Sequence, residues 1–248
     1  MRDLPPIESL VHVSVVDGVR GGRVPREGYQ RGWGLQFGGL SEKIEAEPLF
    51  RHAINSVGIP QLVSPENRKN IYLLLTRYLP KLPSQNIIEF GTYRGGNALF
   101  MALIMRELNP SAKVYALDTF TGMPETDKTR DAHSAGDFSD ASLPVLNERI
   151  AQLGLTNLLP VQGLFEDTFP GLDAGPFGLA HIDCDIYSGV KFAQDAVWPR
   201  MCAGGYVVYD DATVSSCLGA TEAVEELILE RKIHSEQVWP HFVFRVGL

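Results

Sequence analysis

The chain has 248 residues, of which 44% are apolar and 21% are charged. This length fits one large single-sheet domain, alone or with an added arm, and the apolar content is enough for a sizeable core, which argues against disorder. The formal net charge of −8 would repel a phosphate backbone, so we expect no nucleic-acid partner.

The N-terminal region, residues 1–84, is irregular and rich in glycine. It opens MRDLPPIESL, without the apolar core of a signal peptide, and the chain contains no run of about 18 uncharged apolar residues. We therefore expect a cytoplasmic protein with no membrane partner. Apolar residues at helical spacing predict one helix over Pro65–Tyr78. We interpret the region as an arm with helices that flank a site; a loosely packed tail with one docking helix is the alternative.

From Asn86 onward, short apolar runs alternate with amphipathic stretches. Strands are predicted at Asn86–Phe90, Lys113–Asp118, Leu158–Gln162, Leu179–Asp183, Tyr206–Asp210, Ser235–Trp239 and Phe242–Val246. Helices are predicted at Gly95–Leu108, Leu143–Leu153, Val190–Met201 and Gly219–Glu230. The alternation predicts an α/β fold over residues 85–248, with a doubly wound, mostly parallel seven-stranded sheet. No helix separates the last two strands, which predicts an antiparallel hairpin at one edge.

A long polar segment, residues 124–142, follows the second strand. It has almost no apolar residues and cannot bury a face, which predicts a loop. A loop of this length inside a compact domain is often an active-site lid, and plain surface disorder is the alternative. His133 lies in this loop, where it either touches a substrate or is simply solvated.

The end of the first predicted strand carries a glycine-rich turn, EFGTYRGG, from Glu89 to Gly96. Ligands of open α/β sheets bind at the carboxyl ends of the strands, and glycine there lets a ligand approach the backbone. The acid-x-Gly-x-x-x-Gly spacing differs from the dinucleotide pattern GxGxxG. It is the form found in sheets that bind S-adenosylmethionine.

Two further strand ends complete the predicted cofactor site. Asp118 ends the second strand, where an acid can accept both ribose hydroxyls of a nucleoside; a helix cap is the alternative. Phe165 follows the third strand, where it either packs on the adenine or belongs to the core. We assign the S-adenosylmethionine contacts to Glu89, Gly91, Thr92, Tyr93, Gly95, Asp118, Thr119, Phe120, Gly163, Phe165 and Asp183.

Four carboxylates follow the fourth and fifth strands: Asp183 and Asp185, then Asp210 and Asp211. Crowded carboxylates repel one another unless a cation neutralises them, and oxygen-only ligands select Mg²⁺, Mn²⁺ or Ca²⁺ over zinc. The sequence has no histidine or cysteine cluster, and its three cysteines form no CxxC pair, which predicts neither a zinc site nor a disulfide framework. We therefore predict a metal site on Asp183, Asp210 and Asp211, with helix caps and solvated loops as the alternative.

Asp185 is the candidate catalytic base. A hydroxyl is a poor nucleophile toward a methyl sulfonium at neutral pH, but coordination to a cation lowers its pKa and a nearby carboxylate can take the proton. A supporting role or a helix cap is the alternative for Asp185. Among its neighbours, we interpret His181 as a satisfied core histidine and Cys184 as a small buried filler. Tyr187 either lines the acceptor pocket or packs on the following helix.

The motifs GTYRGG, LDTFTGMP, GLFEDTFP, IDCDIY and GGYVVYDD together resemble the macrocin O-methyltransferase family, the metal-dependent sugar methyltransferases of antibiotic biosynthesis. The resemblance runs from about Ile88 to Val246. It implies a class I methyltransferase, Rossmann-like sheet with a mobile lid and Mg²⁺ (or Mn²⁺), and it supports the metal and base assignments. It also implies an N-terminal arm that selects the acceptor and assembles a homo-oligomer, with Trp33 and Phe37 as candidate contacts.

The resulting hypothesis is an O-methyltransferase that moves a methyl group from S-adenosylmethionine to a hydroxyl, on a sugar of a glycosylated small molecule. The chain departs from the family in detail: Thr92 and Tyr93 replace Val-Trp, Cys184 replaces glycine, and Ala212–Ser216 differ, so the acceptor can differ too. A catechol or phenol acceptor is the neighbouring alternative. An NAD-dependent dehydrogenase would need the missing glycine pattern, and a catalytically silent nucleoside-binding scaffold would not need four strand-end carboxylates.

Overall fold

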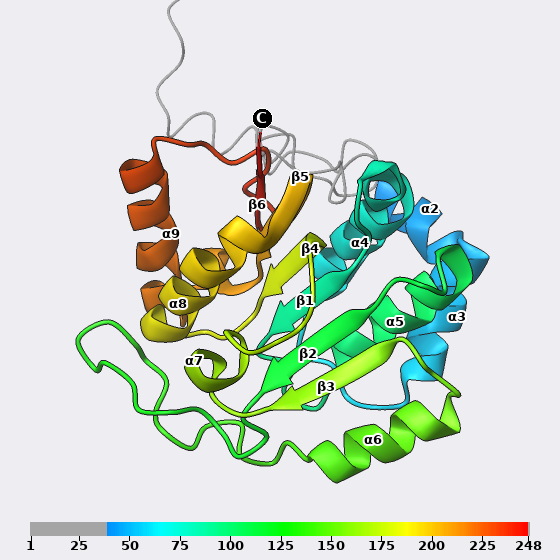
Figure 1. Ribbon diagram of the computed structural model, residues 1–248, viewed down its shortest axis with the longest axis horizontal. Helices are drawn as coiled ribbons and strands as arrows, with labels where there is room; N and C mark the ends of the chain where they lie inside the picture. The colour runs from blue at the N-terminus through cyan, green and yellow to red at the C-terminus, as the bar shows by residue number, and fades with distance from the viewer. Residues whose placement is uncertain (1–38, 248) are drawn as a thin grey trace, which may run out of the picture.

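The computed structural model describes residues 39–247; the candidate contacts Trp33 and Phe37 lie outside the described residues. One sheet of six strands has the order β3-β2-β1-β4-β5-β6 (Figure 1). Its strands are β1 (Ile87–Phe90), β2 (Val114–Asp118), β3 (Leu158–Gln162), β4 (Phe177–Ile182), β5 (Met201–Tyr209) and β6 (Phe242–Arg245). The first five are parallel, and β6 runs antiparallel to β5. The predicted doubly wound sheet with an antiparallel edge is therefore confirmed.

The predicted strand Ser235–Trp239 does not form, so the sheet of the described residues has six strands and not seven. Only one residue of this segment pairs, Gln237, in an isolated antiparallel bridge to Val243. Its alternation reflects burial, since Ser235 is 7% and Gln237 5% exposed while Glu236 between them is exposed. A strand must also pair along its length, and this segment meets the outer edge of β6 at Gln237 alone.

Helices cover both faces of the sheet (Figure 1). One face carries α2 (Leu40–Ala46), α3 (Pro48–Val57), α4 (Pro65–Leu73) with the π-helical turn Leu74–Tyr78, α5 (Gly96–Leu108) and α6 (Leu143–Gln152); the other carries α7 (Phe165–Thr168), α8 (Tyr187–Val197) and α9 (Leu218–Arg231). The predicted helices are confirmed, but residues 40–57, expected to be irregular, form α2 and α3. Phe50, Ala53 and Val57 of α3 are buried at helical spacing and pack with α5. None of the described helices has the length and hydropathy of a membrane span.

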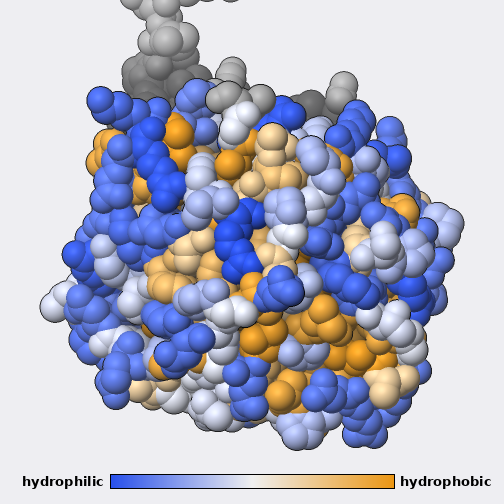
Figure 2. Space-filling view, viewed as in Figure 1, coloured by the Kyte–Doolittle hydropathy of each residue, from blue (hydrophilic) through white to orange (hydrophobic). Residues whose placement is uncertain are grey.

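Both faces of the central strands are buried, which is why they read as continuous apolar runs. In β1, Ile87 packs in the apolar cluster of α3 to α6, and Ile88 and Phe90 pack in the cluster of α8 and α9. The edge strand β3 differs, because it contains Pro160, which an edge tolerates, and its Leu159 is 37% exposed. Figure 2 shows apolar side chains gathered over the β2 and β3 part of the sheet, on the face turned toward the viewer.

The parallel strands end at one edge of the sheet, and the strand order reverses at β1, which pairs with β2 on one side and β4 on the other. Such a reversal opens a crevice where ligands of α/β proteins bind. The loop 124–142 contains no helix or strand, as predicted, and crosses this edge toward α8 and α9 (Figure 1).

Candidate functional site

A cavity of about 620 Å³ opens at the carboxyl ends of β1, β2, β4 and β5. The predicted residues that line it are Glu89, Gly91, Thr92, Tyr93, Asp118, Thr119, Phe165, Asp183, Asp185, Asp210 and Asp211. Gly95, Phe120 and Gly163 are not among its lining residues, and the Phe120 side chain packs in the core at 5% exposure. The parallel topology therefore brings most of the predicted site residues to one cavity.

The turn after β1 is held in shape by Glu89 and Gly91. Gly91 has a left-handed φ of 86°, and a Cβ there would lie 1.8 Å from the backbone oxygen of Asp183. Only glycine permits this close approach of the β1 and β4 ends. The buried Glu89 carboxylate accepts hydrogen bonds from Thr92 Oγ1 (2.6 Å) and Asn97 Nδ2 (2.7 Å), so it fixes the turn from beneath.

The Asp118 carboxylate joins two turns at the cavity. Its oxygens accept hydrogen bonds from the backbone N–H groups of Tyr93 (2.7 Å) and Phe120 (2.7 Å). Burial raises the pKa of Asp118, and these backbone hydrogen bonds oppose the rise. Tyr93 and Phe120 have left-handed φ angles of 52° and 53°. Such strained backbone in non-glycine residues concentrates at functional sites. The helix-cap alternative for Asp118 does not hold, because its carboxylate joins two loop turns and no helix begins at either donor.

Three carboxylates form a compact acidic cluster. Asp183, Asp210 and Asp211 each place one oxygen within 4.8 Å of the others, and Asp210 and Asp211 are both 7% exposed. Burial, followed by the neighbouring carboxylates, raises the pKa values of Asp183 and Asp211 well above the usual range. A hard divalent cation would remove this repulsion, and three carboxylate oxygens are the donor set that Mg²⁺ or Mn²⁺ prefers. The residues present thus fit the predicted metal.

The expectation that no histidine cluster lies at this end of the sheet was wrong. His181 Nε2 lies 3.3 Å and His241 Nδ1 3.6 Å from Asp210 Oδ1, and both rings are fully buried. Asn67 of α4 donates to the same oxygen at 2.8 Å. Burial favours a raised pKa for Asp210, but the interactions with the two histidines outweigh it and lower that pKa. Because these contacts fall on Oδ1, Oδ2 is the oxygen left to face a cation.

His181 is a satisfied core histidine, as predicted, and it links the two halves of the site. Its other ring nitrogen, Nδ1, lies 3.1 Å from Glu89 Oε1. Burial alone would lower its pKa, but hydrogen bonds and charge from Asp210 and Glu89 raise it to about 10. A buried imidazolium therefore bridges the turn after β1 and the acidic cluster.

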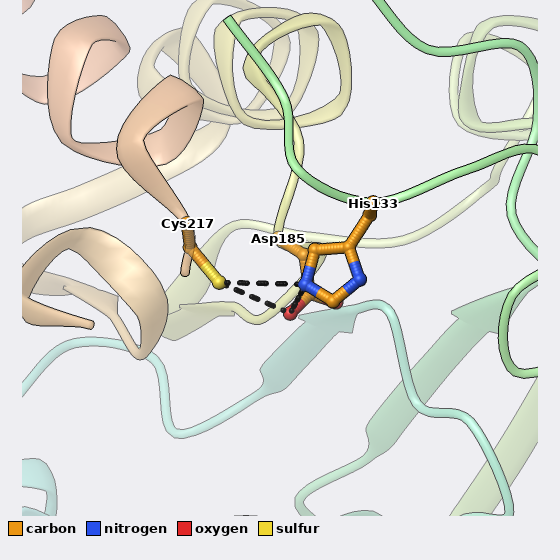
Figure 3. Close-up of side chains that lie close together, drawn as sticks. All are labelled: His133, Asp185 and Cys217. Carbon is orange, nitrogen blue, oxygen red and sulfur yellow. Dashed lines mark hydrogen bonds and ion pairs between the residues drawn. The ribbon is translucent and has the colours of Figure 1, made fainter. Parts of the chain in front are cut away.

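Asp185 lies beside the cluster and beneath the long loop. Its backbone is left-handed (φ 59°), and its N–H donates to Asp211 Oδ2 at 2.9 Å. Its Oδ1 lies 3.4 Å from Cys217 Sγ and 3.6 Å from His133 Nε2 (Figure 3). Burial raises the pKa of Asp185, partly opposed by His133. His133 thus faces the cavity rather than bulk solvent.

The loop 124–142 docks on α8 and α9 through two neighbouring residues. Asp131, 5% exposed, accepts a hydrogen bond from the Tyr187 N–H at 2.9 Å, at the start of α8. The Arg130 guanidinium lies 3.9 Å above the Tyr187 ring, and the Tyr187 hydroxyl donates to Glu226 of α9 at 2.8 Å. Tyr187 therefore packs between the loop and α9, and it is not among the residues that line the large cavity.

Several lining residues were missed by the sequence analysis. They come from α4 and the segment before it, including Val63 and Asn67, from the segment before α9, including Val214, and from Trp239 and Pro240 near the C terminus. His241, beside Asp210, was missed as well. None of these segments carries a recognisable motif, and only the packing of distant segments brings them to the cavity.

Two curated proteins are similar to this chain in sequence. The 8-demethyl-8-(2,3-dimethoxy-alpha-L-rhamnosyl)-tetracenomycin-C 4'-O-methyltransferase of Streptomyces olivaceus is 29% identical over 147 residues, 54% of this chain and 56% of the relative. Mycinamicin III 3''-O-methyltransferase of Micromonospora griseorubida is 27% identical over 155 residues, 57% of this chain and 59% of the relative. The chain thus spans little more than half the length of either relative.

The solved structure of the O-methyltransferase NovP superposes with a TM-score of 0.65 at 19% identity, over 84% of this chain and 95% of that protein. This likeness shows the class I methyltransferase fold. The family model described as macrocin-O-methyltransferase (TylF) matches residues 80–239, more than half of the chain, and the chain therefore belongs to that family.

Proposed function

We propose that the protein is an S-adenosylmethionine-dependent, metal-assisted O-methyltransferase that acts on a sugar hydroxyl of a glycosylated natural product. One observation carries the proposal: a single cavity is lined by Asp118 at a nucleoside-binding strand end and by the acidic cluster with Asp185 beside it. The curated relatives are named for transfer to a rhamnosyl 4' position and to a 3'' position, which supports a sugar acceptor.

The β1 and β2 ends would hold the cofactor. Asp118 would accept the ribose hydroxyls, and Gly91, which lines the cavity, would contact the cofactor through its backbone. Phe165 packs edge-on against Phe90 with ring centroids 5.3 Å apart and lines the cavity, which suits an adenine wall.

The acidic cluster would hold the metal through Asp183, Asp211 and Oδ2 of Asp210. When bound, Mg²⁺ or Mn²⁺ supplies positive charge that lowers the pKa of an acceptor hydroxyl and orients its oxygen. Asp185 lies outside this set and would act on the proton of the acceptor. Its pKa is raised because it is buried, which makes its carboxylate a stronger base than an exposed aspartate.

The reaction follows from this arrangement. Asp185 takes the proton of the acceptor hydroxyl, an O–CH₃ bond forms, and the S–CH₃ bond of the sulfonium breaks to release S-adenosylhomocysteine. The loop 124–142 would act as a lid that excludes water, because it lines the cavity through Pro124, His133 and Phe138. Residues 1–84 would supply acceptor and oligomer contacts in a cytoplasmic homo-oligomer.

The charges around the cavity favour a neutral acceptor. Among the described lining residues no lysine or arginine occurs, and the acidic side chains Asp and Glu predominate among the ionisable ones. Apolar side chains, including Leu62, Met123 and Trp239, line it as well. A sugar on an apolar aglycone fits this lining better than a sugar that carries phosphate groups, which the carboxylates would repel.

Calorimetric titration with S-adenosylmethionine and S-adenosylhomocysteine, with and without Mg²⁺, tests the cofactor. A screen of neutral glycosides, nucleotide sugars and catechols then tests the acceptor, with Asp185→Asn as the inactive variant and the exposed Asp173→Asn as the matched control. Methylation of a glycoside that needs Mg²⁺ and Asp185 supports the proposal. Absence of binding by the folded protein contradicts it, and binding without turnover of any acceptor class favours the silent scaffold.

A further inference from the structure

Three potential metal ligands meet at the cavity wall, outside the acidic cluster. They are His133 of the loop 124–142, Asp185 after β4 and Cys217 at the start of α9 (Figure 3). The cysteine is 84 residues from the histidine and 32 from the aspartate. In Figure 3 the imidazole, carboxylate and thiol point toward one another, and all three residues line the cavity. Folding therefore creates a mixed nitrogen, oxygen and sulfur donor set.

The distances within this set are compatible with a metal ion between the three side chains, and without a metal the two sulfur contacts are hydrogen bonds. His133 Nε2 and Asp185 Oδ1 are 3.6 Å apart, Cys217 Sγ and Asp185 Oδ1 3.4 Å, and Cys217 Sγ and His133 Nε2 3.8 Å. The His133–Asp185 separation is longer than a direct N–H···O hydrogen bond, which measures about 2.7–3.2 Å. A tetrahedral zinc ion with ordinary bond lengths separates such ligand atoms by about 3.3–3.6 Å. Each observed separation lies within about 0.3 Å of the tetrahedral value for its pair of atoms.

A second observation concerns the other nitrogen of His133. Nδ1 lies 3.4 Å from Asp137 Oδ2, and that carboxylate is itself held by the backbone N–H of Ser134 at 2.9 Å. Histidines that bind metals commonly donate their second ring N–H to a carboxylate, which leaves the first nitrogen with its lone pair toward the metal. Asp137 orients the imidazole of His133 in this way toward Cys217 and Asp185.

We propose that His133, Asp185 and Cys217 form a zinc site that is separate from the acidic cluster. Thiolate and imidazole ligands select zinc over Mg²⁺, whereas the all-oxygen cluster has the opposite preference. Cys217 binds as the thiolate and its proton is released to solvent. Two anionic ligands balance the charge of the ion, and the fourth tetrahedral position faces the cavity.

Zinc at this site ties the loop 124–142 to the sheet, because one ligand comes from the loop and one from the end of β4. A further consequence rests on the proposed function. Zinc occupies Oδ1 of Asp185, the carboxylate that takes the acceptor proton, so the loaded protein is inhibited. The site would thus be regulatory, and the zinc-loaded chain is inactive.

Cobalt binding tests the site directly, without any assay of catalysis. Addition of Co²⁺ to the full-length, metal-free protein is expected to give a sulfur-to-cobalt charge-transfer band and tetrahedral d–d bands, saturating at one equivalent and abolished by excess Zn²⁺. Cys217→Ser is expected to remove the charge-transfer band. The matched control is Cys184→Ser, because Cys184 also lines the cavity but lies outside the donor set. Far-ultraviolet circular dichroism confirms that both variants fold.

Two further variants test the geometry. His133→Asn is expected to abolish tight zinc binding, and Asp137→Asn to weaken it about 10- to 100-fold while the thiolate band persists. Zinc is also expected to raise the thermal midpoint of the wild type but not of Cys217→Ser. Cobalt that binds without a thiolate band, or zinc affinity that is equal in wild type and Cys217→Ser, overturns the proposal. Loss of the charge-transfer band in Cys184→Ser rather than in Cys217→Ser also overturns the proposal.

Methyl transfer in the presence of Mg²⁺ tests the regulatory consequence separately. Each variant is compared with its own rate without zinc, and zinc is expected to inhibit the wild type but not Cys217→Ser. Equal inhibition of both would place the zinc effect at another site and refute the regulatory role. If the protein transfers no methyl group, the cobalt spectrum still decides whether the zinc site exists.

Discussion

His181→Phe tests the buried charge bridge that joins the cofactor turn to the acidic cluster. The substitution keeps an aromatic ring but removes both nitrogen contacts, 3.1 Å to Glu89 and 3.3 Å to Asp210. Those carboxylates are 1% and 7% exposed. Removal of one partner from a buried ion pair leaves an uncompensated charge and costs about 3–5 kcal/mol. For a domain of this size we expect the thermal midpoint to fall by about 6–20 °C.

Urea and thermal unfolding, measured in a chelator so that no metal masks the loss, check this prediction. The matched control is His234→Phe, because His234 is exposed, and it should change stability by less than about 0.5 kcal/mol. His181→Gln should recover part of the loss, since its amide can donate to one carboxylate. A stability of His181→Phe within about 0.5 kcal/mol of the wild type would refute the view that His181 is a charged structural bridge.

Three other substitutions have distinct expected outcomes. Gly91→Ala should destabilise the fold by about 4 kcal/mol or more, because its Cβ would lie 1.8 Å from a backbone oxygen. Gly136→Ala has open space around it and should destabilise the fold by only about 1–2 kcal/mol, the strain of its left-handed backbone. Similar urea midpoints for the two variants would contradict this prediction. Asp118→Ala should weaken S-adenosylmethionine binding about 10- to 100-fold by calorimetry, and unchanged affinity in a folded variant would remove Asp118 from the cofactor site. Arg130→Ala should speed limited proteolysis within residues 124–142, because it loses the stack on Tyr187; an unchanged cleavage rate would mean that Arg130 does not hold the loop.

The sequence was sufficient to predict the sheet, because each central strand buries both faces and therefore appears as a short continuous apolar run. It also predicted that Asp183 and Asp210, 27 positions apart in the chain, lie close together. That inference needed only the rule that parallel strands end at the same edge. The loop at 124–142 followed in the same way from its lack of apolar residues. The roles of these residues in cofactor and metal binding stay predictions.

Only the tertiary structure decided the contacts between segments that carry no motif. Ser235–Trp239 has the alternation of a strand, yet it pairs with β6 at Gln237 alone, and a pattern of burial does not reveal whether a buried segment pairs. His241 and Asn67 reach Asp210 from segments that lie far apart in the sequence. His133 and Cys217 meet at Asp185 although the sequence spacing excluded a zinc motif. Local periodicity determines which side of a segment is buried, whereas the partners of a polar side chain depend on long-range packing, and that packing has no signature at any single position.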